Sequence, residues 1–149
     1  MQIQKRFGTQ GLQGMRVCDI GSGTGFTGII GAALGAQEAT LTDQTTVQAL
    51  LEENIRLCSD QVSSDVVQFA EFDWDASPAH LSPPFDLILV SDCVLPKLYP
   101  IEPLVKVLLA ACSVWSIFFE FQTQSCLYLH EECVHNMYVF DSCTIYYRQ

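Results

Sequence analysis

Short apolar runs alternate along the chain with segments whose apolar residues follow a helical spacing. The apolar runs predict strands at residues 15–20, 39–42, 66–72, 85–90 and 114–121. The helical spacing predicts helices at residues 24–34, from 45 to about 57, and from the prolines near 100 to about 112. Because strands and helices alternate, we expect an α/β fold: a three-layer α-β-α, Rossmann-like parallel sheet with incomplete terminal strands.

The second predicted helix has an amphipathic pattern. Thr45 or Thr46 is expected to cap its N-terminus. One stripe at i, i+3 and i+4 spacing is expected to face the sheet. Its members are Val47, Leu50, Leu51, Asn54 and Leu57.

The end of the chain carries weaker signals. Residues 125–136 are expected to be helical, and residues 137–140 and 144–147 to form a hairpin. Cys126, His130 and Cys133 would share one face of that helix, with His135 pointing elsewhere. A partly buried helix explains this spacing better than a metal centre, so we expect no metal.

Composition narrows the function classes. The chain has 149 residues, enough for one domain, and 49% of them are hydrophobic. The net charge of −10 disfavours nucleic acid as a partner and is compatible with a lysine-bearing protein. The seven cysteines form no C-x-x-C pair, and we see neither a signal peptide nor a run long enough to cross a bilayer. We expect a soluble cytoplasmic or nuclear protein without membrane association, and the sequence indicates no oligomeric state.

A glycine-rich loop joins the first predicted strand to the first predicted helix. It reads Asp19-Ile20-Gly21-Ser22-Gly23-Thr24-Gly25. Glycines let the backbone turn sharply and approach a ligand closely. The loop therefore predicts a nucleotide-type cofactor contacted by Asp19, Gly21, Ser22, Gly23, Thr24 and Gly25.

The charge around this loop discriminates between cofactors. No Lys or Arg occurs from residue 17 to 55, whereas Asp19 and Asp43 are both expected to face the loop. Residues 23–28 match the G-x-G-x-x-G dinucleotide pattern, but the pyrophosphate of NAD would then lie beside Asp19 with no cation nearby. S-adenosylmethionine (SAM) carries an ammonium and a sulfonium, and its carboxylate can accept backbone N–H groups at the helix start. SAM is favoured over NAD, and a P-loop is excluded because no Gly-Lys-Ser/Thr follows.

Acidic residues follow each of the next predicted strands. Asp43 ends the second strand, about 20 residues after the loop, where a carboxylate commonly accepts the ribose hydroxyls. The alternative for Asp43 is an N-cap of the next helix. Asp73 and Asp92 follow the third and fourth strands. Because parallel strands bind ligands at their carboxyl ends, these acids are expected to converge on one edge.

With these elements in place, the chain resembles the class I, seven-strand SAM-dependent methyltransferases. Within them it is most similar to the methyltransferase-like protein-lysine methyltransferases. Four stretches of residues 13–120 carry the resemblance: 17–28, 41–44, 72–74 and 85–92. It implies a single SAM-dependent methyltransferase domain over residues 1–149, with a short N-terminal extension at 1–12 and a divergent C-terminal part at 122–149.

The resemblance also implies roles for individual residues. Gln44 and Ser91 would join Asp43 in binding SAM, and Asp73 with Trp74 would frame the adenine. Trp74 as a core or loop anchor is the alternative. Asp92 would orient the amine of a protein lysine for methyl transfer.

Other features leave alternatives open. Leu95 stands where the family usually has an aromatic residue. The family also has a longer N-terminal segment before its first strand, whereas this chain is expected to reach that strand within about 15 residues. A catalytically impaired, truncated domain that binds SAM or a protein is therefore one alternative. A small-molecule methyltransferase is the other.

Overall fold

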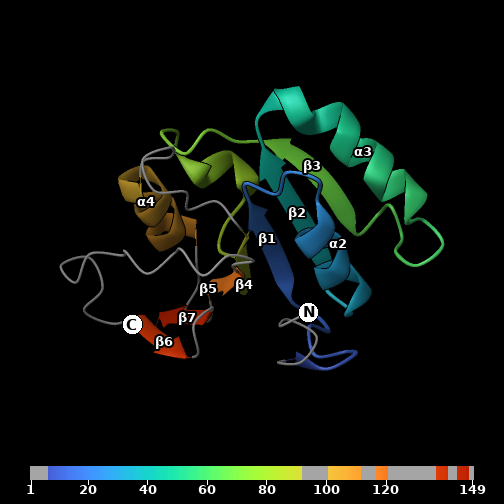
Figure 1. Cartoon of the computed structure of the whole chain (residues 1–149), viewed down its shortest axis with the longest axis horizontal. Coiled ribbons are helices and arrows are strands. Elements are labelled where there is room, and N and C mark those ends of the chain that lie inside the picture. Colours follow the sequence, from blue (N-terminus) through green and yellow to red (C-terminus); the bar gives the residue numbers. More distant parts are fainter. Residues whose placement is uncertain (1–6, 92–100, 112–116, 121–136, 141–143, 148–149) are drawn as a thin grey trace.

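A five-stranded parallel sheet forms the centre of the molecule (Figure 1). The computed structural model describes residues 7–91, 101–111, 117–120, 137–140 and 144–147. The strand order is β3-β2-β1-β4-β5. The strands are β1 (Arg16–Ile20), β2 (Glu38–Asp43), β3 (Val67–Glu71), β4 (Leu87–Ser91) and β5 (Ile117–Glu120). The predicted α/β, Rossmann-like parallel sheet is confirmed.

Helices cover both faces of this sheet. Helices α2 (Phe26–Ala33) and α3 (Gln48–Leu57) lie on one side, and α4 (Ile101–Ala111) lies on the other (Figure 1). Alternate residues of each strand point to opposite faces, so β1 sends Val17 toward α2 and Cys18 toward α4. Each face therefore has its own apolar core, and the three predicted layers are present.

Shorter elements complete the described part of the chain. Two 3-10 turns, η1 (Thr45–Val47) and η2 (Pro78–Leu81), follow β2 and precede β4. The predicted hairpin is confirmed as the antiparallel pair β6 (Met137–Phe140) and β7 (Thr144–Tyr147), and β7 lies alongside β5. The proposed helix at 125–136, with its cysteines and histidines, lies outside the described residues. Within the described ranges, no cluster of metal-ligating side chains occurs and no helix is long and apolar enough to cross a bilayer.

The sequence-based description of α3 was wrong in two respects. Thr45 and Thr46 belong to η1, and the residue before α3 is Val47, which makes no side-chain cap. Leu50 and Leu57 are 53% and 63% exposed, whereas Leu51 is fully buried. The buried stripe instead runs from Leu51 through residues 55 and 58. The stripe through Leu50 and Leu57 and the stripe one residue later both match helical spacing. Packing of Leu51 against the core determines that the second stripe is the buried one.

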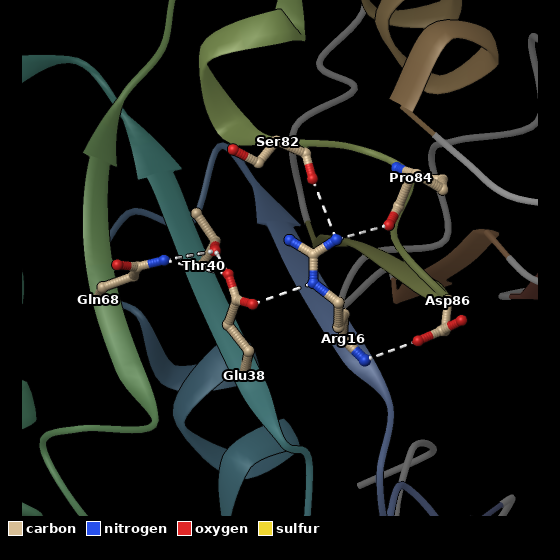
Figure 2. Close-up of polar contacts among 7 residues, drawn as sticks. All are labelled: Arg16, Glu38, Thr40, Gln68, Ser82, Pro84 and Asp86. Atoms are coloured by element: carbon tan, nitrogen blue, oxygen red, sulfur yellow. Dashed lines mark hydrogen bonds and ion pairs between the residues drawn. The ribbon is translucent and has the colours of Figure 1, made fainter.

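Arg16 organises the amino ends of the central strands (Figure 2). Its Nε pairs with Glu38 Oε2 at 3.0 Å, and its Nη1 donates to the carbonyls of Ser82 and Pro84, each at 3.0 Å. Its backbone N–H donates to Asp86 Oδ2 at 2.8 Å. The hydrogen-bonded ion pair raises the pKa of Arg16 and lowers that of Glu38. This network links β1, β2 and the segment leading into β4 at the sheet edge opposite the glycine loop.

Candidate functional site

The register of the strands brings the predicted site residues to one edge. Ile20 pairs with Thr42 and with Val90, and Thr42 pairs with Ala70. The residues that follow this row therefore lie side by side at the carboxyl edge. They are Gly21, Asp43, Glu71 and Ser91. Because β1 is flanked by β2 and β4, the strand order reverses here, which is where open α/β sheets bind their ligands.

The glycine loop turns three times through left-handed backbone conformations. Gly21, Gly23 and Gly25 have φ of 66°, 53° and 77°, a region that side chains with a Cβ rarely occupy. The N–H of Ser22 donates to the Thr42 carbonyl at 2.9 Å, which fixes the loop to β2. A Cβ added at Gly23 would meet no atom within 4 Å, so this part of the loop faces open space. A ligand can approach the backbone there.

Asp43 holds the loop from the second strand. Its Oδ2 accepts the N–H of Gly23 at 2.8 Å, and its Oδ1 accepts the N–H of Gln44 at 2.7 Å. Each carboxylate oxygen has a further lone pair, so Asp43 can still accept hydroxyl protons of a ribose. The N-cap position of η1 is Gln44, whose side chain makes no cap hydrogen bond, so Asp43 is not the N-cap residue and that alternative is wrong.

Asp19 lies beneath the loop. Only 1% of the residue is exposed, and its Oδ2 accepts the N–H of Gly28 at 2.8 Å. Burial raises its pKa to about 7; the Gly28 bond opposes that shift, and the negative charge of Asp43 adds to it. The sequence predicts that this carboxylate faces the ligand; in the structure it is buried and bound to Gly28 of α2, so its contact with the cofactor stays a prediction. Sequence position identifies a strand end, whereas side-chain direction follows from the pleat.

Two buried polar atoms at the loop are left unpaired. Asp19 Oδ1 and Ser22 Oγ have no hydrogen-bond partner among the described residues. Buried polar atoms are normally paired, so these two are suited to a polar ligand. Because residues 17–55 contain no cationic side chain, the site fits a ligand with its own positive groups, such as SAM, better than a pyrophosphate.

Helix α2 begins directly at the loop. Gly25 precedes it without a side-chain cap, and its first turn has no acidic residue. The first N–H groups of a helix attract an anion, so a cofactor carboxylate is suited to this position. A Cβ on Gly28 would lie 2.7 Å from Leu41 Cγ and 3.0 Å from Asp19 Oδ2. Glycine at 28 therefore lets α2 pack closely on β1 and β2.

The segment after β3 carries the predicted adenine-side pair. Asp73 is exposed, and its Oδ1 accepts the N–H of Asp75 at 3.0 Å. Trp74 is half-buried and packs against the core cluster that contains Phe72. The ring of His80 lies 5.6 Å from the ring of Phe72, and His80 Nε2 contacts the carbonyl of Glu71 at 3.0 Å. The structure thus gives Trp74 an anchoring role, and adenine contact by Asp73 and Trp74 stays a prediction.

The fourth strand ends at Ser91, which is half-buried and pairs with Glu120 of β5. Asp92, the predicted orienting acid, lies outside the described residues, as does Leu95. Their roles stay predictions from the resemblance.

The sequence places Asn54 only in the predicted apolar stripe, yet in the structure it contacts the glycine loop. Its Nδ2 donates to the Thr24 carbonyl at 2.8 Å. The contact could have been predicted from the amide in an otherwise apolar stripe, because an amide that faces another element needs a polar partner.

Comparison with known proteins shows the family of this chain. A family described as lysine methyltransferases matches residues 1–124. The chain belongs to the lysine methyltransferase family, whose members are SAM-dependent methyltransferases. A curated relative is the protein N-lysine methyltransferase METTL21A of Danio rerio, which is 38% identical over 85 residues; these cover 56% of this chain and 38% of the relative. The chain matches only 38–43% of the length of such curated relatives.

Solved structures show the same fold. A conserved hypothetical protein of Streptococcus pyogenes superposes with a TM-score of 0.72 and 18% identity, covering 99% of this chain and 94% of the other. An S-adenosylmethionine-dependent methyltransferase of Mesorhizobium loti superposes with a TM-score of 0.53 and 17% identity, covering 75% of this chain and 48% of the other. The sheet and the loop at its carboxyl edge therefore follow the class I methyltransferase fold that the sequence predicted.

Proposed function

We propose that this chain carries the catalytic domain of a protein-lysine N-methyltransferase, which transfers a methyl group from SAM to a lysine amine of a protein substrate. The observation that carries the proposal is the glycine loop, held at Gly23 by Asp43 in a segment free of basic residues, within a chain of the lysine methyltransferase family. The METTL21A relative, named as a protein N-lysine methyltransferase, supports the acceptor class.

Different residues of the carboxyl edge would bind different parts of SAM. Asp43 would accept the ribose hydroxyls while it holds Gly23. The free N–H groups at the start of α2 would bind the carboxylate, and Asp73 with Trp74 would border the adenine. When bound, SAM supplies an electrophilic methyl on a good leaving group, so the protein's task is alignment more than acid–base chemistry.

The acceptor lysine must be neutral to react, and a free lysine has a pKa of about 10.4. Desolvation near the sheet edge lowers that pKa because burial disfavours the ammonium form. Ser91 ends β4, the strand next to β1, so it lies at the same edge of the sheet as the glycine loop. Asp92 is proposed to orient the amine there.

Incubation of the purified chain with methyl-labelled SAM and a cell lysate tests the proposal. We expect one or few labelled protein bands, with the label recovered as methyl-lysine after hydrolysis. Label confined to small molecules would instead identify a small-molecule methyltransferase. Binding of S-adenosylhomocysteine without any labelled product would favour a domain that binds the cofactor but does not catalyse transfer.

A further inference from the structure

Helix α3 reaches the glycine loop through two side chains. Asn54 Nδ2 donates to the Thr24 carbonyl at 2.8 Å. Because a carbonyl only accepts, the NH2 side of the amide must face it. Leu51, one turn earlier, lies against the loop as well, since a Cβ on Gly25 would be 3.3 Å from Leu51 Cγ.

The Asn54 bond completes the fixing of one peptide unit. The N–H of this Thr24–Gly25 unit belongs to Gly25 and donates to the Ser22 carbonyl at 2.7 Å. Its C=O belongs to Thr24 and accepts from Asn54. Glycine adopts positive and negative φ about equally well. Gly25 permits its φ of 77°, but a glycine does not by itself prevent a flip of the Thr24–Gly25 peptide unit.

The orientation of this unit matters because α2 begins at the next residue. Gly28 N–H is already bound by Asp19, so within the described residues the first-turn donors left for a ligand are the N–H groups of Phe26 and Thr27. Their direction follows from the backbone at residues 24 and 25. We propose that Asn54 is a positioning residue for the cofactor: by holding the Thr24 carbonyl, it keeps the glycine loop in the conformation that receives SAM.

This inference rests on the proposed function, because SAM is the ligand whose binding it explains. When only part of the protein has the competent loop conformation, the apparent Kd equals the intrinsic Kd divided by the competent fraction. Loss of one hydrogen bond therefore predicts about a threefold to tenfold weaker affinity, without loss of the fold.

Titration calorimetry with S-adenosylhomocysteine tests the proposal on the full chain. Asn54→Leu removes the donor at nearly constant shape. The matched control is Gln48→Leu, which removes an amide of the same helix whose Nε2 donates to Glu52 at 2.8 Å and not to the loop. We expect a Kd raised threefold to tenfold by Asn54→Leu and by less than about twofold in the control. Asn54→Ala repeats the test with a smaller side chain.

A second measurement separates positioning from general stability. The unliganded Asn54→Leu protein is expected to unfold within about 5 °C of the wild type, and its Gly25 amide to exchange hydrogen faster. An unchanged Kd overturns the proposal, whether or not the unfolding temperature falls. If the wild type itself does not bind S-adenosylhomocysteine, the proposed function fails; if the wild type binds and Asn54→Leu binds equally well, only the role of Asn54 fails.

Discussion

The carboxylate of Asp43 accepts the backbone N–H of Gly23 at 2.8 Å, across 20 residues of sequence. The bond joins the tip of β2 to the loop after β1, so one side chain both shapes the loop and offers acceptors at the sheet edge. Two consecutive loop residues are thus held by the same β2–α3 unit, Gly23 by Asp43 and Thr24 by Asn54.

Asp43→Asn is expected to weaken the binding of S-adenosylhomocysteine by about tenfold to hundredfold, because it removes the charge that assists both the hydrogen bond from Gly23 and the proposed hydrogen bonds from the ribose. Titration calorimetry measures the change. Asp60→Asn removes the same charge from an exposed position and is the control. An equal loss in both variants would mean that net charge, not position, governs affinity.

Glycines 28 and 31 of α2 should respond in opposite ways to alanine. A Cβ at 28 would lie 2.7 Å from two atoms of Leu41, whereas one at 31 would lie 3.4 Å from Leu89 Cδ1, an ordinary contact. Gly28→Ala should therefore lower the free energy of unfolding by about 1–3 kcal/mol. Gly31→Ala should leave it unchanged or raise it by up to about 1 kcal/mol through helix propensity. Chemical denaturation would contradict this account if the two variants behaved alike.

Asp19 should make stability depend on pH. Its pKa is about 7 in the folded protein against an ordinary value of 3.8, so the folded state binds the proton more tightly than the unfolded chain. Its contribution to the free energy of unfolding therefore falls as pH rises from about 4 to 7 and is constant above that range. Relative to Asp19→Asn, the wild type should lose on the order of 4 kcal/mol across this interval. Parallel unfolding curves of the two proteins from pH 4 to 8 check this, and a constant difference between them would contradict the buried state of Asp19.

Arg16→Lys should destabilise the protein by about 1–3 kcal/mol, since a lysine cannot bind Glu38 and two carbonyls in the same geometry. Arg56→Lys is the control: its pair with Glu53 is exposed and local, so no measurable loss of stability is expected. Chemical denaturation measures both. Affinity for S-adenosylhomocysteine should stay within about twofold of the wild type, because Arg16 lies at the opposite sheet edge. A large fall in affinity would show that the two edges are coupled.

Asp92→Ala should abolish methyl transfer while the binding of S-adenosylhomocysteine stays nearly intact, because the proposed role of Asp92 is to orient the acceptor amine. The labelled-SAM assay and calorimetry on the same preparation measure the two properties. Equal loss of both would assign Asp92 to cofactor binding instead.

The strands and the cofactor edge were predictable because each rests on local signals. A buried parallel strand appears as a short apolar run, and the glycine loop with Asp43 follows such runs at fixed distances. The exposed face of α3, the burial of Asp19 and the contact of Asn54 with Thr24 were not predicted. Each depends on how one element rotates against another, and that is decided by long-range packing of residues such as Leu51.

The order of the strands separates two tasks along the chain. Every described residue assigned to the cofactor, apart from Ser91, lies between positions 19 and 74, on β1 to β3 and their loops. The segment that would choose the methyl acceptor follows β4, on the far side of the reversal in strand order. Under the proposed function, recombination after position 91 with another member of the fold should change the acceptor that is methylated and leave the described residues assigned to the cofactor unaltered.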